Sequence, residues 1–485
     1  MIEMTLSDGR RIFGPRELTA QVEAEQDWLQ THATAETRYA LLADNGMAWA
    51  VADLALTECA RLNVPIPQYF TAEQVRHVLD DAGVDVLLTD DPARIAREHP
   101  EWRSRARSPI SGLYAFERLT TLAVRPELPL GTCKITYTSG STGQAKGVCL
   151  DLKSLQQVTQ SVAEVARPLD ATRHLCLLPL ATLLDNVATT GVVRLLGATS
   201  VVPSLAETGI RYGKVEVPLL LECIQRYQPH SLVLVPELLR ILLAAISKGW
   251  SAPRSLRFIA IGGASVSPQL LQQAELAGLP VFEGYGLSEC ASVVSLNRPG
   301  AKKLGSAGRP LPHAKVRIDD CGEIHVAGST MLGYLGSKST PEEIATGDRG
   351  YFDDEGYLHV TGRLKNILIT SFGRNISPEW IERELLSCPE IAQAVVVGDG
   401  RAFLSALLQP TSPAVSPAAM TAAIARVNAG LPDYAKLGAW RQPEEPFSVA
   451  NGLLTANGRP RRPQIAEAHA ELIASLYADS IKEVS

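Results

Sequence analysis

The sequence predicts an α/β protein with at least two domains, and three observations support this expectation. The 485 residues exceed the roughly 250–300 residues at which a single hydrophobic core stops growing. A hydrophobic fraction of 46% with 20% charged residues is ordinary for a globular chain. Short strand-like runs alternate with helical patterns over most of the length, which is typical of parallel α/β layers.

The alternation predicts individual elements between residues 84 and 361. We expect strands at residues 84–88, 175–178, 200–202, 232–235, 258–261 and 281–283, with helices over residues 152–165 and 267–276 between them. From Val316 onward the pattern changes, and it predicts short strands with alternating apolar and polar residues at 316–318, 323–326 and 357–361. Residues 353–356, Asp-Asp-Glu-Gly, are expected to form a hairpin turn.

Charge and cysteine content exclude several classes of protein. A net charge of −6 argues against a nucleic-acid binder, so any polyanionic substrate must be met by a local site. The eight cysteines form no C-x-x-C pair and have no zinc-finger spacing, which indicates reduced core thiols. The first residues lack signal-peptide features, and charged residues interrupt the most apolar segment, 232–246. We expect a cytoplasmic protein with no integral membrane segment.

Residues 136–147 form a loop rich in glycine and hydroxyl groups that ends with Lys146 and Gly147. The preceding run, residues 134–137, has strand character, so the loop leaves a strand with free N–H groups, hydroxyls and one cation. A Walker A loop would place Ser or Thr after the lysine, whereas glycine follows Lys146 here. The sequence therefore predicts a polyphosphate site made of Thr138, Ser139, Gly140, Ser141, Thr142, Gly143 and Lys146.

Four more segments follow this loop in order: Tyr285-Gly286-Leu287-Ser288-Glu289, Thr346-Gly347-Asp348, Gly362-Arg363-Leu364-Lys365-Asn366 and Gly373-Arg374-Asn375-Ile376-Ser377-Pro378-Glu379. The set resembles the adenylate-forming superfamily, which contains acyl- and aryl-CoA synthetases, firefly luciferase and peptide-synthetase adenylation domains. Long-chain fatty acyl-CoA synthetases are the most similar branch. The resemblance runs from about Leu18 to the Arg461-Arg462 region.

The resemblance implies a specific architecture. It predicts a large N-terminal AMP-binding domain, residues 1–364, of two layered α/β sheets plus a small β-barrel-like subdomain. A small, mobile α+β C-terminal domain, residues 365–485, is expected to follow. Adenylation and thioester formation happen at one place, so the small domain must present a different face for each reaction. Lys365 then lies at the hinge, and Gly373, Arg374 and Asn375 line the pantetheine tunnel.

The resemblance also implies roles at the nucleotide site. Glu289 and Thr142 are expected to bind Mg²⁺, and carboxylate and hydroxyl oxygens suit this ion. Tyr285 is expected to stack on adenine, and the ribose hydroxyls are expected to meet Asp348 and Arg363 at the two ends of a β-hairpin. The remaining residues expected around the nucleotide and acyl group are Gly263, Ala264, Gly286 and Ser288.

Two positions depart from the family pattern, and the first is Arg459. Aligned on Gly458, the lysine that contacts the acyl carboxylate and phosphate in the family becomes Arg459 here. Arginine keeps a permanent charge but is bulkier and planar, so the exchange is not conservative. Three interpretations remain: Arg459 performs the task, Arg461 or Lys436 replaces it, or adenylation is weak and the protein starts from an acyl-adenylate.

The second departure is at Thr182, where long-chain synthetases have a histidine beside the acyl carboxylate. A hydroxyl can still donate a hydrogen bond, although it supplies neither an aromatic wall nor a cation. Asp185 follows three residues later. It either holds a substrate amine, as in amino-acid adenylation domains, or caps the following helix, and the cap is the preferred interpretation.

The sequence thus predicts an ATP-dependent enzyme that converts a carboxylic acid, a medium- or long-chain fatty acid in the preferred interpretation, to acyl-AMP and then to a thioester. The catalytic residues are expected to be Lys146, Glu289, Arg459 and Thr182. The cofactors expected are ATP, Mg²⁺ and either CoA or phosphopantetheine. One alternative is a ligase that loads a dedicated acyl or peptidyl carrier protein. The other is a nucleotide-binding scaffold or regulator with impaired adenylation.

Overall fold

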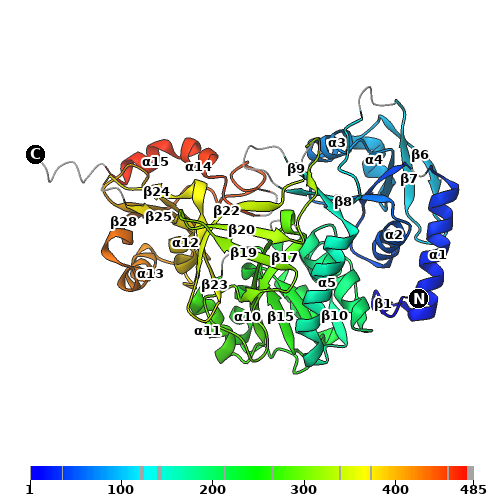
Figure 1. The fold of residues 1–485 in the computed structure, drawn as a ribbon. Helices are drawn as coiled ribbons and strands as arrows, with labels where there is room; N and C mark the ends of the chain where they lie inside the picture. Colours follow the sequence, from blue (N-terminus) through cyan, green and yellow to red (C-terminus); the bar gives the residue numbers. More distant parts are fainter. Residues whose placement is uncertain are drawn as a thin grey trace, which may run out of the picture.

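The computed structural model describes residues 2–34, 36–120, 125–138, 145–211, 214–264, 266–337, 340–371, 374–455 and 458–477. A large N-terminal part contains two extensive sheets with helices against their faces. A smaller C-terminal part has its own three-stranded sheet and lies at one side of the molecule (Figure 1). This mixed α/β arrangement is the one that the sequence predicts.

The first large sheet has nine strands, and its centre is parallel. The pairs β10·β14, β14·β15 and β15·β16 are all parallel. The predicted strand at 258–261 is confirmed, and the other predicted strands of this sheet differ from the observed ones at their ends. In spatial order the strands are β18 (Arg309–Pro310), β17 (Ser292–Leu296), β16 (Val281–Leu287), β15 (Phe258–Ile261), β14 (Ser231–Leu234), β10 (Arg173–Leu175), β11 (Thr199–Val201), β1 (Thr5–Ser7) and β2 (Ile12–Phe13).

The second large sheet has eight strands and is mixed. Its buried centre pairs β3 with β4 and β5 in parallel, whereas β8 and β9 are antiparallel and flank the predicted phosphate loop. The order is β21 (Gly333–Tyr334), β9 (Lys146–Asp151), β8 (Thr132–Thr138), β4 (Leu62–Pro65), β3 (Arg38–Leu42), β5 (Val86–Thr89), β7 (Tyr114–Arg118) and β6 (Trp102–Arg107).

Several helices start where the sequence supplies a side-chain cap. Thr71 and Gln74 form a capping box at α3, and Asp151 and Ser267 cap α5 and α11. The helices of the N-terminal part are α1 (Pro15–Thr31), α2 (Met47–Glu58), α3 (Ala72–Asp81), α4 (Pro92–Glu98), α5 (Leu152–Ala166), α6 (Leu183–Asn186), α7 (Val193–Leu195), α8 (Leu205–Thr208), α9 (Val217–Tyr227), α10 (Pro236–Ser247) and α11 (Pro268–Leu276). Short helical segments are η1 (Arg167–Leu169), the π-helix η2 (Val187–Val192) and η3 (Ser288–Cys290).

Helices cover both faces of the nine-stranded sheet. Apolar residues of α9, α10 and α11 share one hydrophobic cluster with β14 and β15. On the opposite face, Val158, Val162 and Ala166 of α5 cluster with Phe258 of β15. Helix α2 contributes Trp49, which is fully buried, to a cluster that includes residues of both large sheets. Burial on both faces explains why the central strands are continuous apolar runs.

An antiparallel four-stranded sheet stands where the barrel-like piece is expected. It consists of β19 (Ala314–Ile318), β20 (Glu323–Gly328), β22 (Glu343–Phe352) and β23 (Leu358–Arg363). Asp353 accepts hydrogen bonds from the backbone N–H groups of Glu355 and Tyr357, which forms the predicted hairpin turn between β22 and β23. A further pair of strands, β12 (Ile210–Arg211) and β13 (Lys214–Val215), is antiparallel.

The C-terminal part has a core of its own, in which Ile381 and Leu385 of its first long helix pack against Leu404 and Leu408. It shows on the left of Figure 1, from yellow to red. Its elements are η4 (Leu364–Asn366), β24 (Leu368–Ile369), β25 (Asn375–Ile376), α12 (Pro378–Leu386), β26 (Ile391–Val397), β27 (Leu404–Pro410), α13 (Pro417–Gly430), η5 (Asp433–Ala435), β28 (Leu437–Arg441), α14 (Arg462–Ala468) and α15 (Ala470–Ser475).

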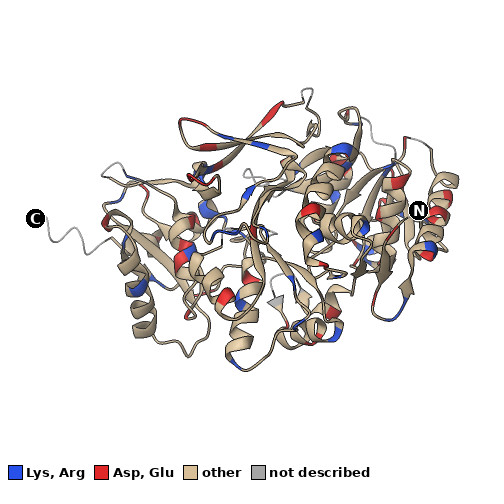
Figure 2. Ribbon diagram, turned by 60° about the horizontal axis from the view of Figure 1, so that its bottom comes forward, with Lys and Arg blue, Asp and Glu red and all other residues tan. Residues whose placement is uncertain are grey.

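Charges of both signs are interspersed along the helices in the view of Figure 2, in keeping with the net charge of −6. All eight cysteines are free thiols, and five of them are buried. Cys321 is exposed and Cys59 and Cys133 are half-buried, so the expectation of core thiols is wrong for these three. Within the described ranges, no helix has the length and apolar character needed to cross a bilayer.

Candidate active site

A cavity of about 1940 Å³ lies where the C-terminal part meets the N-terminal part. It is lined by the ends of β15, β16 and β23, by η3 and η4, and by the segment that precedes α14. The structure therefore brings together motifs that are far apart in the chain. The residues predicted from the sequence that line this one cavity are Lys146, Thr182, Gly263, Ala264, Tyr285, Gly286, Ser288, Glu289, Asp348, Arg363, Lys365 and Arg459.

Asp348 and Arg363 face each other across the β22·β23 hairpin, as the sequence predicts. Arg363 Nε lies 2.8 Å from Asp348 Oδ1, and the Tyr285 hydroxyl donates to Asp348 Oδ2 at 2.8 Å. The Asp348 side chain is buried, and burial raises its pKa. Arg363, Tyr285 and Arg459 oppose that rise in pKa by stabilising the carboxylate.

Two glycines of the motifs are required by close packing. A Cβ on Gly286 would lie 1.7 Å from the carbonyl oxygen of Ser292 on the neighbouring strand β17. At Gly362, φ is +148° and a Cβ would lie 1.9 Å from the Ser377 hydroxyl of the C-terminal part. Neither position can hold a side chain without displacing its surroundings. These glycines therefore let β16 and β23 place Tyr285 and Arg363 beside the cavity.

Glu289 lies on η3, shortly after Tyr285 in the chain. Its Oε1 accepts a hydrogen bond from the hydroxyl of Tyr334 at 2.9 Å, and its backbone carbonyl accepts from Met331 N at 2.7 Å. Lys146 approaches the ring of the same tyrosine, with Nζ 5.5 Å from the ring centroid. Burial, followed by the charge of Glu289, raises the pKa of Tyr334, so its hydroxyl stays a donor. Tyr334 thus connects the predicted metal ligand to the predicted phosphate lysine.

Arg459 reaches the cavity from the C-terminal part. Its Nη2 donates to the backbone carbonyl of Gly263 at 2.6 Å, across the boundary between the two parts. The residue as a whole is exposed because it extends across an open cavity, although protein atoms surround its charged end. This partial desolvation of the guanidinium, followed by the charge of Arg363, lowers the pKa of Arg459, whereas nearby carboxylates act in the opposite direction. Arg459, the residue expected at the position of the family lysine, therefore lines the cavity.

The other two candidates for that role differ in position. Arg461 also lines the cavity. Lys436 instead forms an ion pair with Asp433 at 2.6 Å on the protein surface and is not a lining residue. The interpretation in which Lys436 replaces Arg459 has no support in this arrangement.

Four cations converge around Asp348 and Glu289. Burial and then the neighbouring Arg363 lower the pKa of Lys365, and both Arg459 and Lys146 act in the same direction. Cations that lower one another's pKa repel, and an anion between them relieves this repulsion. A polyphosphate is an anion of the kind that such a cluster accommodates.

The predicted phosphate loop and the predicted pantetheine loop are described only in part. Ser139, Gly140, Ser141, Thr142, Gly143 and Gly373 lie outside the described residues, as do the side chains of Thr138 and Asn375. Arg374 is described and exposed, directly before β25, and it does not line the cavity.

Thr182 lines the cavity at the start of α6, and its hydroxyl donates to the carbonyl of Pro179 at 2.7 Å. Asp185 neither faces a substrate site nor caps a helix, so it fits neither of the two roles considered from the sequence. It is fully buried, does not line the cavity, and the residue at the N-cap of α6 is Thr182. The cap interpretation is wrong because the carboxylate turns back to the preceding segment, where the N–H groups of Leu177 and Leu178 donate to its Oδ2.

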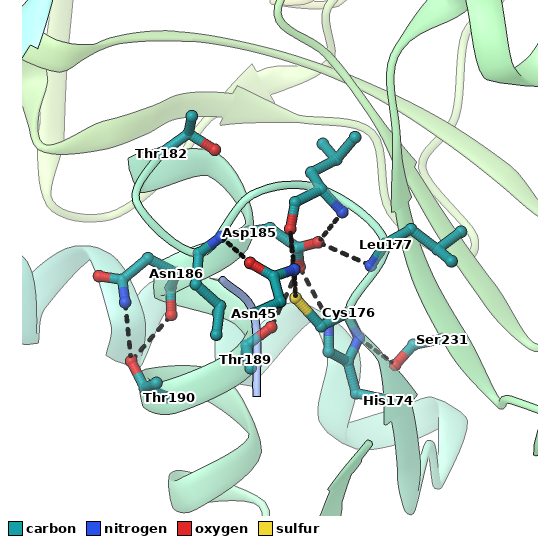
Figure 3. A network of polar contacts seen from close by, with 12 residues as sticks. Asn45, His174, Cys176, Leu177, Thr182, Asp185, Asn186, Thr189, Thr190 and Ser231 are labelled. Carbon is teal, nitrogen blue, oxygen red and sulfur yellow. Dashed lines mark hydrogen bonds and ion pairs between the residues drawn. The ribbon is translucent and has the colours of Figure 1, made fainter. Parts of the chain in front are cut away.

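The remaining oxygen of Asp185 completes a buried network (Figure 3). Its Oδ1 lies 3.1 Å from His174 Nε2 and 3.1 Å from the hydroxyl of Thr189 on the π-helix η2. The other ring nitrogen, His174 Nδ1, lies 3.0 Å from Ser231 Oγ. Both Asp185 oxygens are thus occupied by protein groups, which leaves no capacity for a substrate amine.

The cavity continues into the N-terminal part between the nine-stranded sheet and the helices that cover it. We call this extension the apolar channel. Helices α5 and η2 form one wall, and strands β14 and β15 form the other. Its lining includes Val162, Ala166, Val187, Val192, Val233, Phe258 and Ala260. Such a channel can hold an apolar chain whose polar end lies in the wider part of the cavity.

Tyr334, the apolar channel and Glu283 were not predicted from the sequence. Glu283 lies on β16 and lines the cavity, and burial raises its pKa to about 8. Its Oε2 has no partner in the described structure, and the nearby charge of Arg383 on α12 lowers the pKa only in part. The signal for Glu283 was its place two residues before Tyr285, whereas the channel depends on packing between distant segments.

Two family models match the chain. Residues 7–335 match the AMP-binding enzyme model, and residues 365–481 match the model of the AMP-binding enzyme C-terminal domain. The chain belongs to the AMP-binding enzyme family. The expected membership of the adenylate-forming superfamily is confirmed, and with it the expected class of enzyme, an AMP-forming acid–thiol ligase.

Relatives within this family act on different acids, according to their names. The long-chain-fatty-acid–CoA ligase FadD15 of Mycobacterium tuberculosis is 30% identical over 424 residues, which cover 74% of this chain and 70% of that protein. The 2-succinylbenzoate–CoA ligase of Bacillus subtilis is 30% identical over 341 residues, which cover 66% of each.

Solved structures of family members share the fold. The o-succinylbenzoate CoA synthetase MenE from Bacillus subtilis, in complex with ATP and magnesium ion, has a TM-score of 0.75 at 25% identity and covers 95% of this chain and 96% of its own. The anthranilate CoA ligase AuaEII, in complex with anthranoyl-AMP, has a TM-score of 0.79 at 19% identity over 98% and 95% of the two chains. The predicted fold class, a large α/β N-terminal domain with a C-terminal domain, is confirmed.

Proposed function

We propose that this enzyme uses ATP and Mg²⁺ to convert a carboxylic acid to acyl-AMP and then transfers the acyl group to CoA. The observation that carries the proposal is the contact of Arg459 with the Gly263 carbonyl, which places a cation of the C-terminal part beside Asp348 and Glu289. A cation at this position can stabilise charge on the acyl carboxylate and the α-phosphate as they join.

In this proposal Asp348 and Arg363 hold the ribose hydroxyls. A carboxylate offers about four acceptor positions, and Tyr285 and Arg363 use two of those on Asp348. The remaining acceptor positions suit a diol. The adenine is assigned to the surface formed by Gly263, Ala264, Tyr285, Gly286 and Ser288, where the bond from the Tyr285 hydroxyl to Asp348 fixes the orientation of the ring on which adenine stacks.

The phosphates are assigned to Lys146 and to the loop residues Thr138, Ser139, Gly140, Ser141, Thr142 and Gly143. Glu289 and Thr142 are the proposed Mg²⁺ ligands. The Glu289 carboxylate fits this role because Tyr334 orients one of its oxygens and because Mg²⁺ prefers hard oxygen donors. When bound, Mg²⁺ would neutralise charge on the phosphates.

The acyl carboxylate is assigned to the space between Thr182 and Arg459. Both residues line the same cavity as the apolar channel. Arg459 orients the carboxylate toward the α-phosphate, and pyrophosphate leaves as the acyl-phosphate bond forms.

The second half-reaction requires the C-terminal part to turn. We assign residues 1–364 to the adenylating domain and residues 365–485 to a domain that rotates about Lys365. Rotation would withdraw Arg459 from the cavity and bring the loop of Gly373, Arg374 and Asn375 to it, where this loop would line the pantetheine tunnel. The exposed position of Arg374 is compatible with a residue that is used only after rotation.

A medium- or long-chain fatty acid is the acid that we propose, because the lining of the channel is apolar and the fatty-acid ligase FadD15 is a relative. CoA is the proposed thiol because the named relatives are CoA ligases. A carrier-protein phosphopantetheine is the alternative acceptor. The eight free cysteines are consistent with a reducing, cytoplasmic location, which forms part of the proposal.

Pyrophosphate release with a panel of carboxylic acids tests the proposal directly. Acid-dependent release followed by CoA-dependent formation of AMP and thioester is the expected result. Thioester formation only with a holo-carrier protein would favour the carrier-loading alternative. ATP binding without pyrophosphate release from any acid would favour the scaffold alternative and overturn the enzymatic proposal.

A further inference from the structure

The inner end of the apolar channel carries polar groups. His174 pairs with Ser231, and Ser231 pairs with Phe258, in the parallel register of β10, β14 and β15. Residues in register on neighbouring parallel strands point to the same face of the sheet, so these three side chains share the face covered by α5. His174 and Ser231 both line the cavity, although both are largely buried. His174 and Ser231 therefore add an imidazole and a hydroxyl to the lining of an otherwise apolar channel.

The strand register also gives the depth of this polar end. Ser231 is level with Phe258, and Gly262, at the wide part of the cavity, is four positions beyond Phe258. At about 3.3 Å per residue, the polar end lies roughly 13 Å from the site assigned to the carboxylate. This depth suits an acid of medium chain length rather than a short one.

The network around His174 fixes how Ser231 can bind a ligand. Nε2 of His174 faces the Asp185 carboxylate, which only accepts hydrogen bonds, so Nε2 carries a hydrogen. If the imidazole is neutral, its Nδ1 accepts from the Ser231 hydroxyl, and the Ser231 oxygen can still accept. If the imidazole is protonated, Nδ1 donates to Ser231, and the Ser231 hydroxyl can still donate. In each protonation state of His174, the Ser231 hydroxyl therefore has one donor or acceptor position that its hydrogen bond with His174 does not use.

A ligand hydroxyl matches both states because it can donate or accept. A terminal methyl group would instead leave the function of Ser231 unsatisfied in a buried environment, which is unfavourable. The Asp185 network also holds the imidazole rigidly, since Leu177, Leu178 and Thr189 donate to the same carboxylate (Figure 3). Thr189 belongs to the π-helical wall of the channel, and π-helical segments are frequent at functional sites.

We propose that the enzyme selects a medium-chain carboxylic acid with a hydroxyl group at its far end, and that Ser231 is the residue that recognises this hydroxyl. The inference rests on the proposed acid activation. In it, the carboxylate lies near Arg459, the chain follows the channel, and the distal hydroxyl exchanges a hydrogen bond with Ser231. His174 and Asp185 act as positioning residues because Ser231 and Asp185 engage both ring nitrogens of His174, which orients Ser231.

The test compares ω-hydroxy fatty acids with unsubstituted fatty acids of the same length in pyrophosphate release. For the wild-type enzyme, the ratio of kcat/KM for the hydroxy acid to that for the plain acid should be roughly ten or more. The ratio should be greatest at the chain length that spans the channel. In Ser231→Ala the ratio should fall to about one, whereas Ser231→Thr, which keeps a hydroxyl, should restore part of it.

Val233→Ala is the matched control. Val233 lines the same face two residues nearer the wide part of the cavity, so its truncation should change kcat/KM for both acids and leave their ratio unaltered. Equal use of both acids by the wild type, or an unchanged ratio in Ser231→Ala, would overturn this inference and leave acid activation intact. Absence of pyrophosphate release with every acid would overturn the proposed function itself, and this inference with it.

Discussion

Two buried aspartates of this enzyme show how one side chain can serve opposite purposes. Asp348 faces the cavity, and protein groups occupy only part of its hydrogen-bonding capacity. Asp185 is sealed inside the N-terminal part, and four protein groups donate to its two oxygens. A carboxylate that lines a cavity and has unused acceptor positions can bind a ligand. A carboxylate whose acceptor positions are all used by protein groups can only stabilise the fold.

The charges around each aspartate differ as well. Asp348 lies among Arg363, Arg459 and Glu289, so its surroundings are charged and would change if the C-terminal part moved. The partners of Asp185 are two backbone N–H groups, a hydroxyl and an imidazole, all from the N-terminal part. Substitutions in the Asp185 network should therefore lower stability, and substitutions at the cavity should lower activity.

The largest effect on stability is expected for Asp185→Asn. An amide offers one acceptor oxygen to the four groups that donate to Asp185, so at least two of these hydrogen bonds must be lost or reversed, and the free energy of unfolding should fall by about 2–5 kcal/mol. Urea denaturation followed by tryptophan fluorescence measures this change. Asp348→Asn is the matched control: it should alter the unfolding free energy by less than about 1 kcal/mol, because burial already disfavours the charge of Asp348. Equal effects of the two variants would contradict the distinction.

The largest effect on the reaction is expected for Arg459→Ala. Loss of a charge that acts in the transition state should reduce acyl-AMP formation by about 10²–10³-fold, or about 2.7–4 kcal/mol. Thioester formation from supplied acyl-AMP should be spared, because Arg459 is assigned to the adenylating pose only. Arg459→Lys should retain or raise activity. Normal adenylation by Arg459→Ala would transfer the role to Arg461, which also lines the cavity, and Arg461→Ala would then be the variant to measure.

The two aspartates also show how far a sequence can be interpreted without a structure. Asp348 was found because the segment Thr346-Gly347-Asp348 resembles the ribose-binding motif of the family, and the hairpin register sets Asp348 opposite Arg363. The strand at 258–261 and the helices α5 and α11 were also predictable, because hydrophobic periodicity and helix-capping residues are local features of the sequence. The boundaries of β10 and β5 were not, because the apolar run of a buried strand does not stop where the strand stops.

Asp185 could not be understood from its neighbours in the chain. Its position near Thr182 suggested a helix cap. The carboxylate instead forms hydrogen bonds with His174 and with Thr189 of the π-helix η2. Tyr334 was missed because it reaches Glu289 from β21, a two-residue strand with no periodic signal. Contacts of this kind depend on which distant segments pack together, and that information is spread over the whole sequence.

Lys146→Ala tests the cation side of the cavity. The lysine is exposed at the start of β9, so its removal should leave the fold intact. Loss of charge-assisted contacts with the phosphates should reduce kcat/KM for ATP by about ten-fold or more. Lys436→Ala provides the control, because this lysine pairs with Asp433 outside the cavity and should not affect ATP use. A folded Lys146→Ala enzyme with unchanged adenylation kinetics would defeat the phosphate assignment.

Glu289→Gln removes a charge from the proposed metal site and keeps the volume of the side chain. The concentration of Mg²⁺ needed for half-maximal activity should rise by roughly ten-fold. The hydrogen bond from Tyr334 can persist, since the amide oxygen also accepts, so thermal stability should change little. Titration of activity with Mg²⁺ at saturating ATP measures the shift. Wild-type Mg²⁺ dependence in this variant would make Glu289 a structural residue.

The smallest effect is expected for Glu283, a cavity carboxylate with a pKa raised to about 8 by burial. Between pH 4.5 and about 8 the unfolded chain releases the proton of Glu283 while the folded enzyme keeps it, so the unfolding free energy decreases as pH rises. The slope is at most about 1.4 kcal/mol per pH unit, and the opposing charge of Arg383 reduces the total change.

Glu283→Gln should remove this decline, because an amide has no proton to release. The stability of the variant relative to wild type should therefore increase from about pH 5 to about pH 8, as measured by urea denaturation at each pH. Glu275→Gln, at an exposed glutamate paired with Lys302, should show no such trend. A constant difference between Glu283→Gln and wild type across this range would mean that Glu283 is ionised in the folded enzyme, and that the Arg383 charge outweighs burial at this edge of the cavity.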